Sequence, residues 1–192
     1  MRLAKVKKWA TAALLSLAAS LFAPVRSTTL APMTFEELAR RATAIVHVRC
    51  LGSQSAWSGG EIWTDSRFEV VEKWKADPAA PAGQNIIVVR QLGGTLGGLH
   101  SHVEGVPQFA AGEEDCLFLW RRGDEPYRVL GWSQGTFRVA RDPHSGTARV
   151  TQDSALSAFH AEGREFQSTG VRNLTLAAFQ RNLQQALDAV KQ

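Results

Sequence analysis

Hydrophobic and polar residues alternate along much of the chain, in short stretches separated by turn-forming residues. The clearest stretches are 44–51, 62–75, 85–92 and 116–120, followed by "YRVLGW", "TFRVARD" and "TARVT". A period of two with β-branched and aromatic residues is typical of strands with one buried face. In the first stretch Val46, Val48 and Cys50 share a face. His47 and Arg49 lie on the other face, and we expect His47 to be solvated.

Two stretches follow the helical period instead. Thr34 and Glu37 form a capping box at the start of a short helix over 35–42. Near the end of the chain, apolar residues recur every three or four positions and predict an amphipathic helix over 175–191, with Thr175 as its N-cap. Its apolar residues are Leu176, Phe179, Leu183, Leu187 and Val190. The stretch 154–169 follows neither period, so no element is predicted there.

Five or more short strands between turns, with a helix near each end, favour a mainly β fold of the α+β class. A small antiparallel β-barrel is the architecture that this order suggests. The N-terminal helix would cap the barrel, and the amphipathic helix would place its apolar stripe against the barrel wall or its open end.

The first 27 residues have the layout of a secretory signal peptide. Arg2, Lys5, Lys7 and Lys8 precede an apolar run over 9–23, which is too short for a membrane span. Cleavage after Ser27 fits better than cleavage after Ala23, because Pro24 would follow the latter, but the bond stays open. We expect a periplasmic or extracellular protein whose single domain covers 28–192, with no integral membrane span after cleavage.

Removing this segment changes the charge of the chain. The whole sequence has 22 basic and 18 acidic residues, for a net charge of +4. Five of the basic residues lie within 1–27, so 17 basic and 18 acidic residues remain, for a charge of −1. A nucleic-acid-binding protein needs a clustered positive surface. Nucleic acid is therefore not an expected partner.

Cys50 and Cys116 are the only cysteines in the chain. In an oxidising compartment such a pair favours a disulfide over two free thiols. The first and fourth strands can be neighbours in a small barrel, so we expect a Cys50–Cys116 bond.

The glycine-rich segment that begins at Gly93 invites three interpretations: a phosphate cradle, a metal site or a long turn. Leu99 and His100 follow Gly98, where a phosphate-binding loop needs lysine and a hydroxyl residue. The dinucleotide pattern also requires a helix after its glycines. A turn that needs positive φ angles explains the segment more simply. Its glycines are Gly93, Gly94, Gly97, Gly98 and Gly105, which we take as a candidate binding loop.

A metal site is the alternative for the same segment. In an extended chain His100, His102 and Glu104 share one face and would converge on one ion. Imidazole and carboxylate ligands suit zinc or copper, and a position left to water would make zinc catalytic. No fourth ligand can be identified, so no metal or other cofactor is expected.

The remaining motifs give no catalytic constellation. Gly131–Gly135 reads "GWSQG", but strand-forming residues follow it, whereas a nucleophile elbow leads into a helix. Five tryptophans remain after position 27, and some would suit a stacking surface for sugars or peptides. They are Trp57, Trp63, Trp74, Trp120 and Trp132.

The chain resembles a group of uncharacterised secreted bacterial proteins of unknown function. The resemblance runs through "TFEELARRATAIVHVRC", "IWTDSRFEVVEKWKADP", "VVRQLGG", "GVPQFAAGEEDCLFL", "YRVLGWSQGTFRV" and "LTLAAFQRNL". It covers most of 28–192, implies secretion and a shared fold, and implies no substrate.

A weaker resemblance is to the barrel module of tissue metalloproteinase inhibitors and netrins. Two blocks carry it: Phe68, Val70, Trp74 and Lys75, and then Phe109, Gly112, Glu113, Leu117, Phe118 and Leu119. It implies a barrel of the oligonucleotide/oligosaccharide-binding (OB) type. Those inhibitors use an amino-terminal cysteine to reach the metal of their target, and no cysteine lies near the expected start of this mature chain. Inhibition by that route is not implied.

The sequence therefore predicts a secreted, non-enzymatic binding module with an OB-like fold. Its partner would be an envelope or extracellular protein, peptide or glycan. A small metal-binding protein or metal-dependent hydrolase centred on His100, His102 and Glu104 is the alternative. A structural envelope component is a third possibility.

Overall fold

The structure is a computed structural model that describes residues 31–153 and 170–189. Contacts divide the chain into two units, Met1–Ala31 and Pro32–Gln192, and the elements below belong to the second unit. The expected signal peptide over 1–27 and the stretch 154–169 lie outside the described residues, as does Val190.

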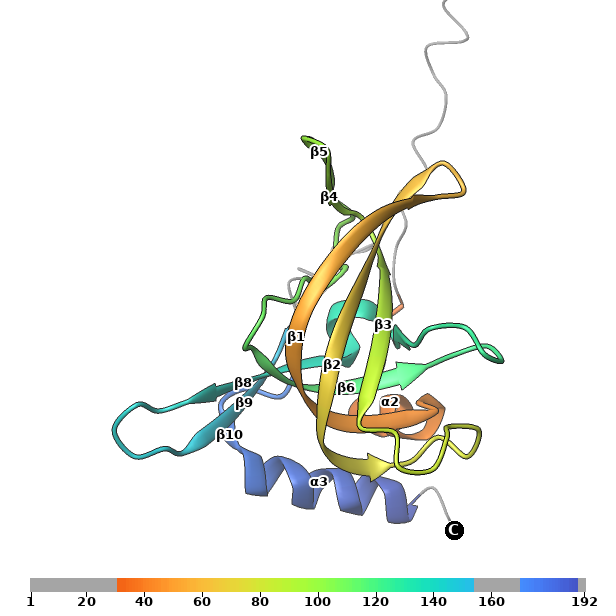
Figure 1. Cartoon of the computed structure of the whole chain (residues 1–192). Helices are drawn as coiled ribbons and strands as arrows, with labels where there is room; N and C mark the ends of the chain where they lie inside the picture. Colours follow the sequence, from red (N-terminus) through yellow and green to blue (C-terminus); the bar gives the residue numbers. More distant parts are fainter. Residues whose placement is uncertain (1–30, 154–169, 190–192) are drawn as a thin grey trace, which may run out of the picture. The chain divides into compact units, whose positions relative to one another are not determined.

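One large antiparallel sheet dominates the fold (Figure 1). Its strands are β1 (Ala44–Ser58), β2 (Glu61–Lys75), β3 (Ile86–Leu92), β6 (Glu114–Trp120), β7 (Arg128–Val129), β8 (Thr136–Arg141), β9 (Ala148–Gln152) and β10 (Leu174–Thr175). A separate hairpin contains β4 (Gly94–Leu96) and β5 (Leu99–Ser101). The helices are α2 (Phe35–Arg41) and α3 (Leu176–Ala189), and a 3-10 turn η1 covers Trp132–Gly135.

The strand order of the large sheet is β10-β9-β8-β6-β1-β2-β3, and β7 pairs with β6 beside this path. The predicted mainly β fold with two helices is confirmed. This strand path is open, with β3 at one end and β10 at the other, so closure into an OB-like barrel is not confirmed. A single parallel bridge joins Val89 of β3 to Tyr127, just before β7.

Strands β1 and β2 are longer than the sequence pattern predicts. The sequence "SQSAWSGGE" over 53–61 predicts a turn, but 53–58 continue β1 and pair with β2 up to the turn at Gly59 and Gly60. Serine and glutamine are weak strand formers, and here the partner strand overrides that preference. Cross-strand hydroxyl pairs contribute: Ser53 Oγ lies 2.7 Å from Ser66 Oγ, and Ser55 Oγ lies 2.8 Å from Thr64 Oγ1.

Alternation along the strands divides the interior into two cores. The sheet core contains Ala44, Val46, Val48, Cys50, Phe68, Ile87, Val89, Phe109, Leu117, Leu119, Tyr127 and Val129. The helix core contains Leu38, Ala39, Ala42, Ile45, Cys116, Phe118, Leu130, Phe137, Val150, Phe179, Leu183 and Ala186. Val46, Val48 and Cys50 thus share a face as predicted.

His47 corrects one expectation from this pattern. Its face of β1 is covered instead of solvated, and His47 is 2% exposed. Its ring stacks near Trp74, with 6.1 Å between ring centroids. Both faces of β1 are therefore buried over this stretch, which a simple alternation of hydrophobic and polar residues does not predict.

The two helices close the helix core from one side of the sheet (Figure 1). Thr34 caps α2 as predicted, since its Oγ1 accepts from the Glu37 amide at 3.1 Å. Thr175 Oγ1 accepts from the Ala178 amide at 3.2 Å at the start of α3. The Phe179 ring packs 5.6 Å from Phe35, centroid to centroid. Among the described residues, no helix has both the length and the apolar character that a membrane crossing requires.

The predicted disulfide is absent, since Cys50 and Cys116 are both buried free thiols. Strands β1 and β6 are neighbours as expected, but their register places Cys116 opposite His47, three residues from Cys50. Cys50 lies in the sheet core and Cys116 in the helix core, so their side chains point to opposite faces. A disulfide needs the two β-carbons to face each other.

Candidate functional site

Two hairpins project from the same end of the large sheet (Figure 1). We call them the hairpin pair: residues 52–64, where β1 and β2 meet, and residues 93–103, which contain β4 and β5. Thr64 joins them, because its Oγ1 donates to the Gly93 carbonyl at 2.6 Å and contacts Ser55 Oγ. A β-carbon on Gly94 would collide with Thr64 Oγ1 and lie 2.5 Å from Ser55 Oγ. Glycine therefore permits the close approach of the two hairpins.

The predicted loop glycines all adopt positive φ angles. These angles are +94° at Gly93, +133° at Gly94, +57° at Gly97, +81° at Gly98 and +79° at Gly105. The segment leads into a hairpin and not into a helix beneath a parallel sheet. This geometry agrees with the interpretation as a turn and lacks the helix N-terminus of a dinucleotide site.

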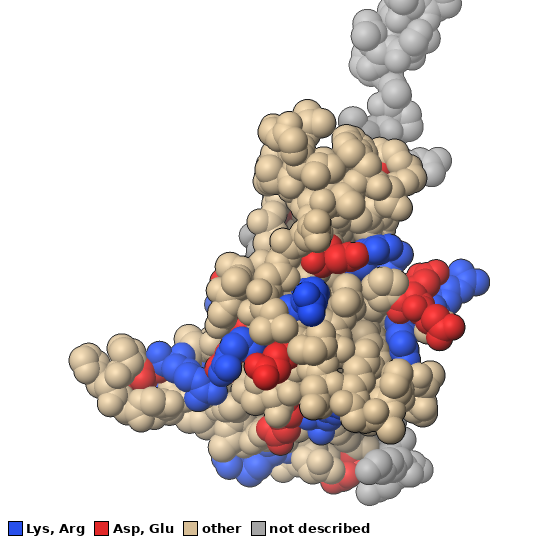
Figure 2. Space-filling model, in the orientation of Figure 1, with Lys and Arg blue, Asp and Glu red and all other residues tan. Residues whose placement is uncertain are grey.

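The surface of the hairpin pair is nearly uncharged and exposes two large apolar side chains. Trp57 and Leu99 are each 56% exposed, the largest fractions among the exposed large hydrophobic residues. Glu61 is the only charged residue within 52–64, and 93–101 has none. Figure 2 shows charged side chains over the body of the sheet, whereas the projecting end carries almost none. Exposed aromatic and aliphatic groups on such a surface suit contact with another molecule.

The structure brings the candidate metal ligands together only in pairs. The rings of His100 and His102 stack with 6.4 Å between centroids, and His102 Nε2 lies 3.4 Å from Glu104 Oε2. His100 Nδ1 lies 2.9 Å from Thr95 Oγ1. Across the described ranges 31–153 and 170–189, no group of three or more His, Cys, Asp or Glu side chains is placed to hold a metal ion.

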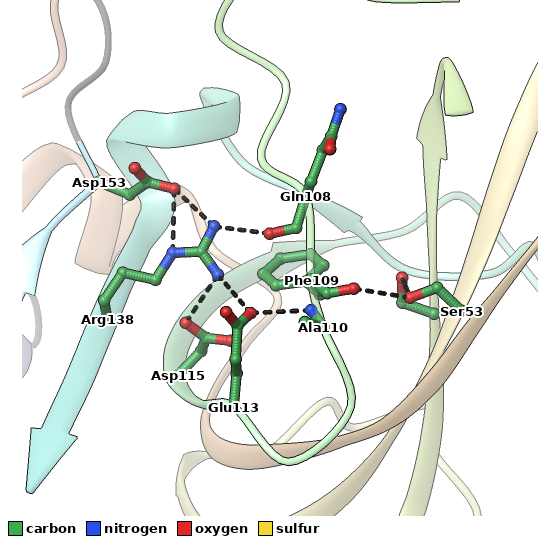
Figure 3. Close-up of polar contacts among 9 residues, drawn as sticks. Ser53, Gln108, Phe109, Ala110, Glu113, Asp115, Arg138 and Asp153 are labelled. Carbon is green, nitrogen blue, oxygen red and sulfur yellow. Dashed lines mark hydrogen bonds and ion pairs between the residues drawn. The ribbon is translucent and has the colours of Figure 1, made fainter. Parts of the chain in front are cut away.

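A charged cluster below the hairpin pair is centred on Arg138 of β8 (Figure 3). Its guanidinium donates to Asp153 at 2.7 Å, and it lies 3.3 Å from Asp115 Oδ1 and 3.4 Å from Glu113 Oε2. It also donates to the Gln108 carbonyl at 2.7 Å. One arginine thus joins β6, β8, the end of β9 and the segment over 105–113.

This cluster holds Phe109 in the sheet core. Arg138 lies over the Phe109 ring, 5.0 Å from its centroid, and that ring meets Phe68 edge-on at 4.9 Å. The Phe109 carbonyl accepts from Ser53 Oγ at 3.1 Å, and Glu113 Oε2 accepts from the Ala110 amide at 2.8 Å. Phe109 therefore fills the end of the sheet core nearest the hairpin pair.

Asp115 is the unusual member of the cluster, since it is fully buried. Burial raises the pKa of its carboxyl to about 7, although the neighbouring Arg138 acts in the opposite direction. Among residues 31–153 and 170–189, nothing forms a hydrogen bond with its Oδ2. Its position at the start of an apolar strand gave no signal of this environment in the sequence.

A second charged cluster surrounds Glu114, the next residue along β6. Hydrogen bonds from Arg141 and Arg49 lower the pKa of Glu114 to about 2, despite partial burial. His47 Nε2 lies 3.2 Å from Glu114 Oε2. Burial lowers the pKa of His47, and Glu114 opposes this effect. All four residues lie on neighbouring strands, and their interactions explain the buried His47 as a structural group.

The "GWSQG" segment is not a nucleophile elbow. It forms η1 between β7 and β8, and Ser133 is 1% exposed. A catalytic serine must reach its substrate, so this buried hydroxyl has no access to one.

The chain was compared with protein-family models, curated proteins and solved structures, and no match was found in any of the three comparisons. Both family resemblances therefore remain predictions.

Proposed function

We propose that this chain is an exported, non-enzymatic binding module that contacts a partner protein through the hairpin pair. The observation that carries the proposal is the joint exposure of Trp57 and Leu99 on two hairpins that are bonded to each other. The basic and apolar start of the sequence supports export. Sequencing the amino terminus of the protein recovered from the periplasm or medium tests export. We expect a chain that begins after the signal segment, and a chain that still begins at Met1 would contradict export.

A protein partner suits this surface better than a glycan or a charged peptide. In protein interfaces, aromatic residues in a weakly charged central region often contribute most of the binding free energy. The hairpin pair presents the exposed Trp57 and Leu99 and little charge, and the hydrogen bonds at Thr64 restrict its movement before binding. The hairpins then lose less conformational entropy on binding, which favours affinity.

A capture experiment with matched variants tests this proposal. The wild-type chain, the double variant Trp57→Ser/Leu99→Ser and the control Val71→Ser/Ile86→Ser are immobilised and exposed to an envelope extract. Val71 and Ile86 are also exposed but lie outside the hairpin pair. We expect the hairpin variant to retain the specific partner at least tenfold less, because each lost hot-spot residue costs about 2 kcal/mol or more. Equal capture by all three proteins would refute the proposal.

We also infer that β1, β2, β3, β6 and β7 form an OB-like barrel closed at Tyr127. Two backbone hydrogen bonds support this inference: Tyr127 donates to the Val88 carbonyl at 3.0 Å, and Arg90 donates to the Tyr127 carbonyl at 2.8 Å. Strand β7 then pairs with β6 on its other side. Hydrogen exchange tests the closure. The amides of Tyr127 and Arg90 should exchange as slowly as amides in the centre of β6, and rapid exchange at both would contradict it.

The metal-dependent alternative gains no support from the described residues. His100, His102 and Glu104 contact one another in pairs but do not converge on one point. It is tested by thermal unfolding with and without one equivalent of zinc, in the wild type and in His100→Ala/His102→Ala. Stabilisation by zinc of the wild type alone would revive it.

A further inference from the structure

The sheet core is filled at one end and incompletely filled at the other. Phe109 occupies the end near the hairpin pair. At the opposite end of β1 and β2 lies a pocket of about 240 Å³. The sheet-core side chains that line it are Ala44, Val46, Ile87, Leu119 and Tyr127, together with Val70. Interiors of small β proteins are normally filled by side chains, so a space of this size requires an explanation.

Small residues leave this space open. The connector between β2 and β3 covers the pocket with Ala76, Ala80, Pro81 and Ala82, and Ala44 lies on the strand side. None of these side chains extends far enough to fill the sheet core. An apolar cavity of about 150 Å³ already stays dry and binds small hydrocarbons. The larger pocket here has room for an alkyl chain.

Two lysines at the end of β2 give the pocket a positive rim. Lys73 and Lys75 both line it. Lys73 Nζ donates to the Gln84 carbonyl at 2.5 Å, and Lys75 Nζ donates to the carbonyls of Ala39 and Arg40 at 3.0 and 3.1 Å. Among the ion pairs of the described residues, neither ammonium has a carboxylate partner. Each ammonium has three donors, so Lys73 retains two for a ligand.

Asp77 is the acidic residue among the described residues that line the pocket, and its charge is balanced by Arg121. Asp77 is buried, and it accepts hydrogen bonds from Arg121, from the Tyr127 hydroxyl and from the Ala79 amide. Those hydrogen bonds lower its pKa although burial acts in the opposite direction. The Gln84 side chain also lines the pocket, and its buried Oε1 finds no hydrogen-bond partner in the part of the chain that the structure describes.

We propose that this pocket binds a medium-chain alkanoate, with its alkyl chain between β1, β2 and the connector and its carboxylate on Lys73. The apolar walls match the chain, and the positive rim matches the carboxylate. The site lies at the far end of β1 and β2 from the hairpin pair and does not depend on the proposed partner protein.

Calorimetric titration of the purified chain with hexanoate, octanoate and decanoate tests the proposal. Affinity should rise about fourfold for each added methylene until the pocket is full, because each buried methylene contributes a fixed increment. Methyl resonances of Val70, Ile87 and Leu119 should shift during the titration. Absence of saturable binding, or an affinity independent of chain length, would overturn the proposal.

Three variants separate the carboxylate from the alkyl chain. Lys73→Ala removes an exposed side chain and should weaken octanoate binding at least fivefold without changing the affinity for 1-octanol. Arg67→Ala, an equally charged and exposed position of β2 outside the pocket, is the control and should bind both as the wild type does. Ala80→Phe should fill the space and abolish both. Equal octanoate affinity in Lys73→Ala and Arg67→Ala would refute the role of Lys73.

The two proposals can fail independently. Trp57→Ser/Leu99→Ser should bind octanoate as the wild type does, because both residues lie outside the pocket. A loss of octanoate binding in this variant would place the alkanoate on the hairpin pair and overturn the pocket assignment.

Discussion

At the residue scale, single side chains and single glycines control how the projecting end is attached to the sheet. Gly94 allows β4 to lie against Ser55 and Thr64, and no larger residue fits there. Arg138 joins the segment over 105–113 to β6 and β8 through four groups. Both attachments are made by polar atoms near the end of the sheet that carries the hairpin pair. Their removal should therefore affect this end first.

Gly94→Asn should destabilise the protein by about 1–3 kcal/mol, because its φ of +133° is strained for other residues and its side chain would meet Thr64. Gly97→Asn is the matched control, since φ is +57° there, which asparagine tolerates, and nothing lies within 4 Å. Urea unfolding measures both. Equal losses in the two variants would show that the close approach at Gly94 has no energetic importance.

Asp115 predicts a dependence of stability on pH. Its folded pKa of about 7 lies above the ordinary value of 3.8, so the folded state holds the proton more tightly. The contribution of Asp115 to the free energy of unfolding is fully present below about pH 4 and is lost as the pH rises to about 7. Asp115→Asn keeps an acceptor for Arg138 and should be more stable than the wild type at pH 8, by up to about 4 kcal/mol. Denaturant unfolding at pH 5 and pH 8 measures the difference. A constant difference between the two proteins would contradict the raised pKa.

At the scale of elements, the helices are held by their apolar faces and not by their length. Helix α2 has seven residues, too few to be stable alone, and its Phe35 ring packs against Phe118, Phe137 and Phe179. Helix α3 contributes Phe179 to the same cluster. The stability of both helices is therefore coupled through one group of aromatic rings.

Phe179→Ala should cost about 3–5 kcal/mol, because it removes a fully buried ring that contacts both the sheet and α2. Asn182→Ala, at an exposed position of the same helix, should change stability by less than about 0.5 kcal/mol. Thermal unfolding followed by circular dichroism compares them. A small loss in Phe179→Ala would mean that α3 is dispensable for the core.

At the scale of the whole molecule, the two cores lie on opposite faces of shared strands, and this separates the two thiols. Cys50 and Cys116 belong to different cores, so no rotation of their side chains brings them together. Stability must come from packing in both cores without a covalent link between β1 and β6. The protein should then be insensitive to the redox state of its compartment.

Thiol titration tests this arrangement. The folded protein should react slowly with an aromatic disulfide reagent because both cysteines are buried. After unfolding, two cysteines per chain should react without prior reduction. Burial also raises the pKa of both thiols, which slows the reaction further. If the unfolded protein reacted only after treatment with a reductant, the two cysteines would be joined in a disulfide and this arrangement would be wrong.

Local periodicity in the sequence was sufficient to predict the main strands, the Thr34 cap and the amphipathic helix. The pattern of one residue and its near neighbours is enough for such elements, because backbone hydrogen bonds and one buried face select them. The glycine-rich segment was also correctly predicted as a turn. Its positive φ angles depend on residue type more than on distant contacts.

Only the tertiary structure decided what each face of a strand meets. It buried His47 beside Trp74, extended β1 through 52–58, raised the pKa of Asp115 and placed Cys50 and Cys116 in different cores. It also placed Lys73 at the rim of an apolar pocket. Each of these results depends on register and on residues far apart along the chain. A shift of one position in strand pairing turns every side chain to the opposite face, so these results follow from how the strands pair and not from one strand's sequence alone.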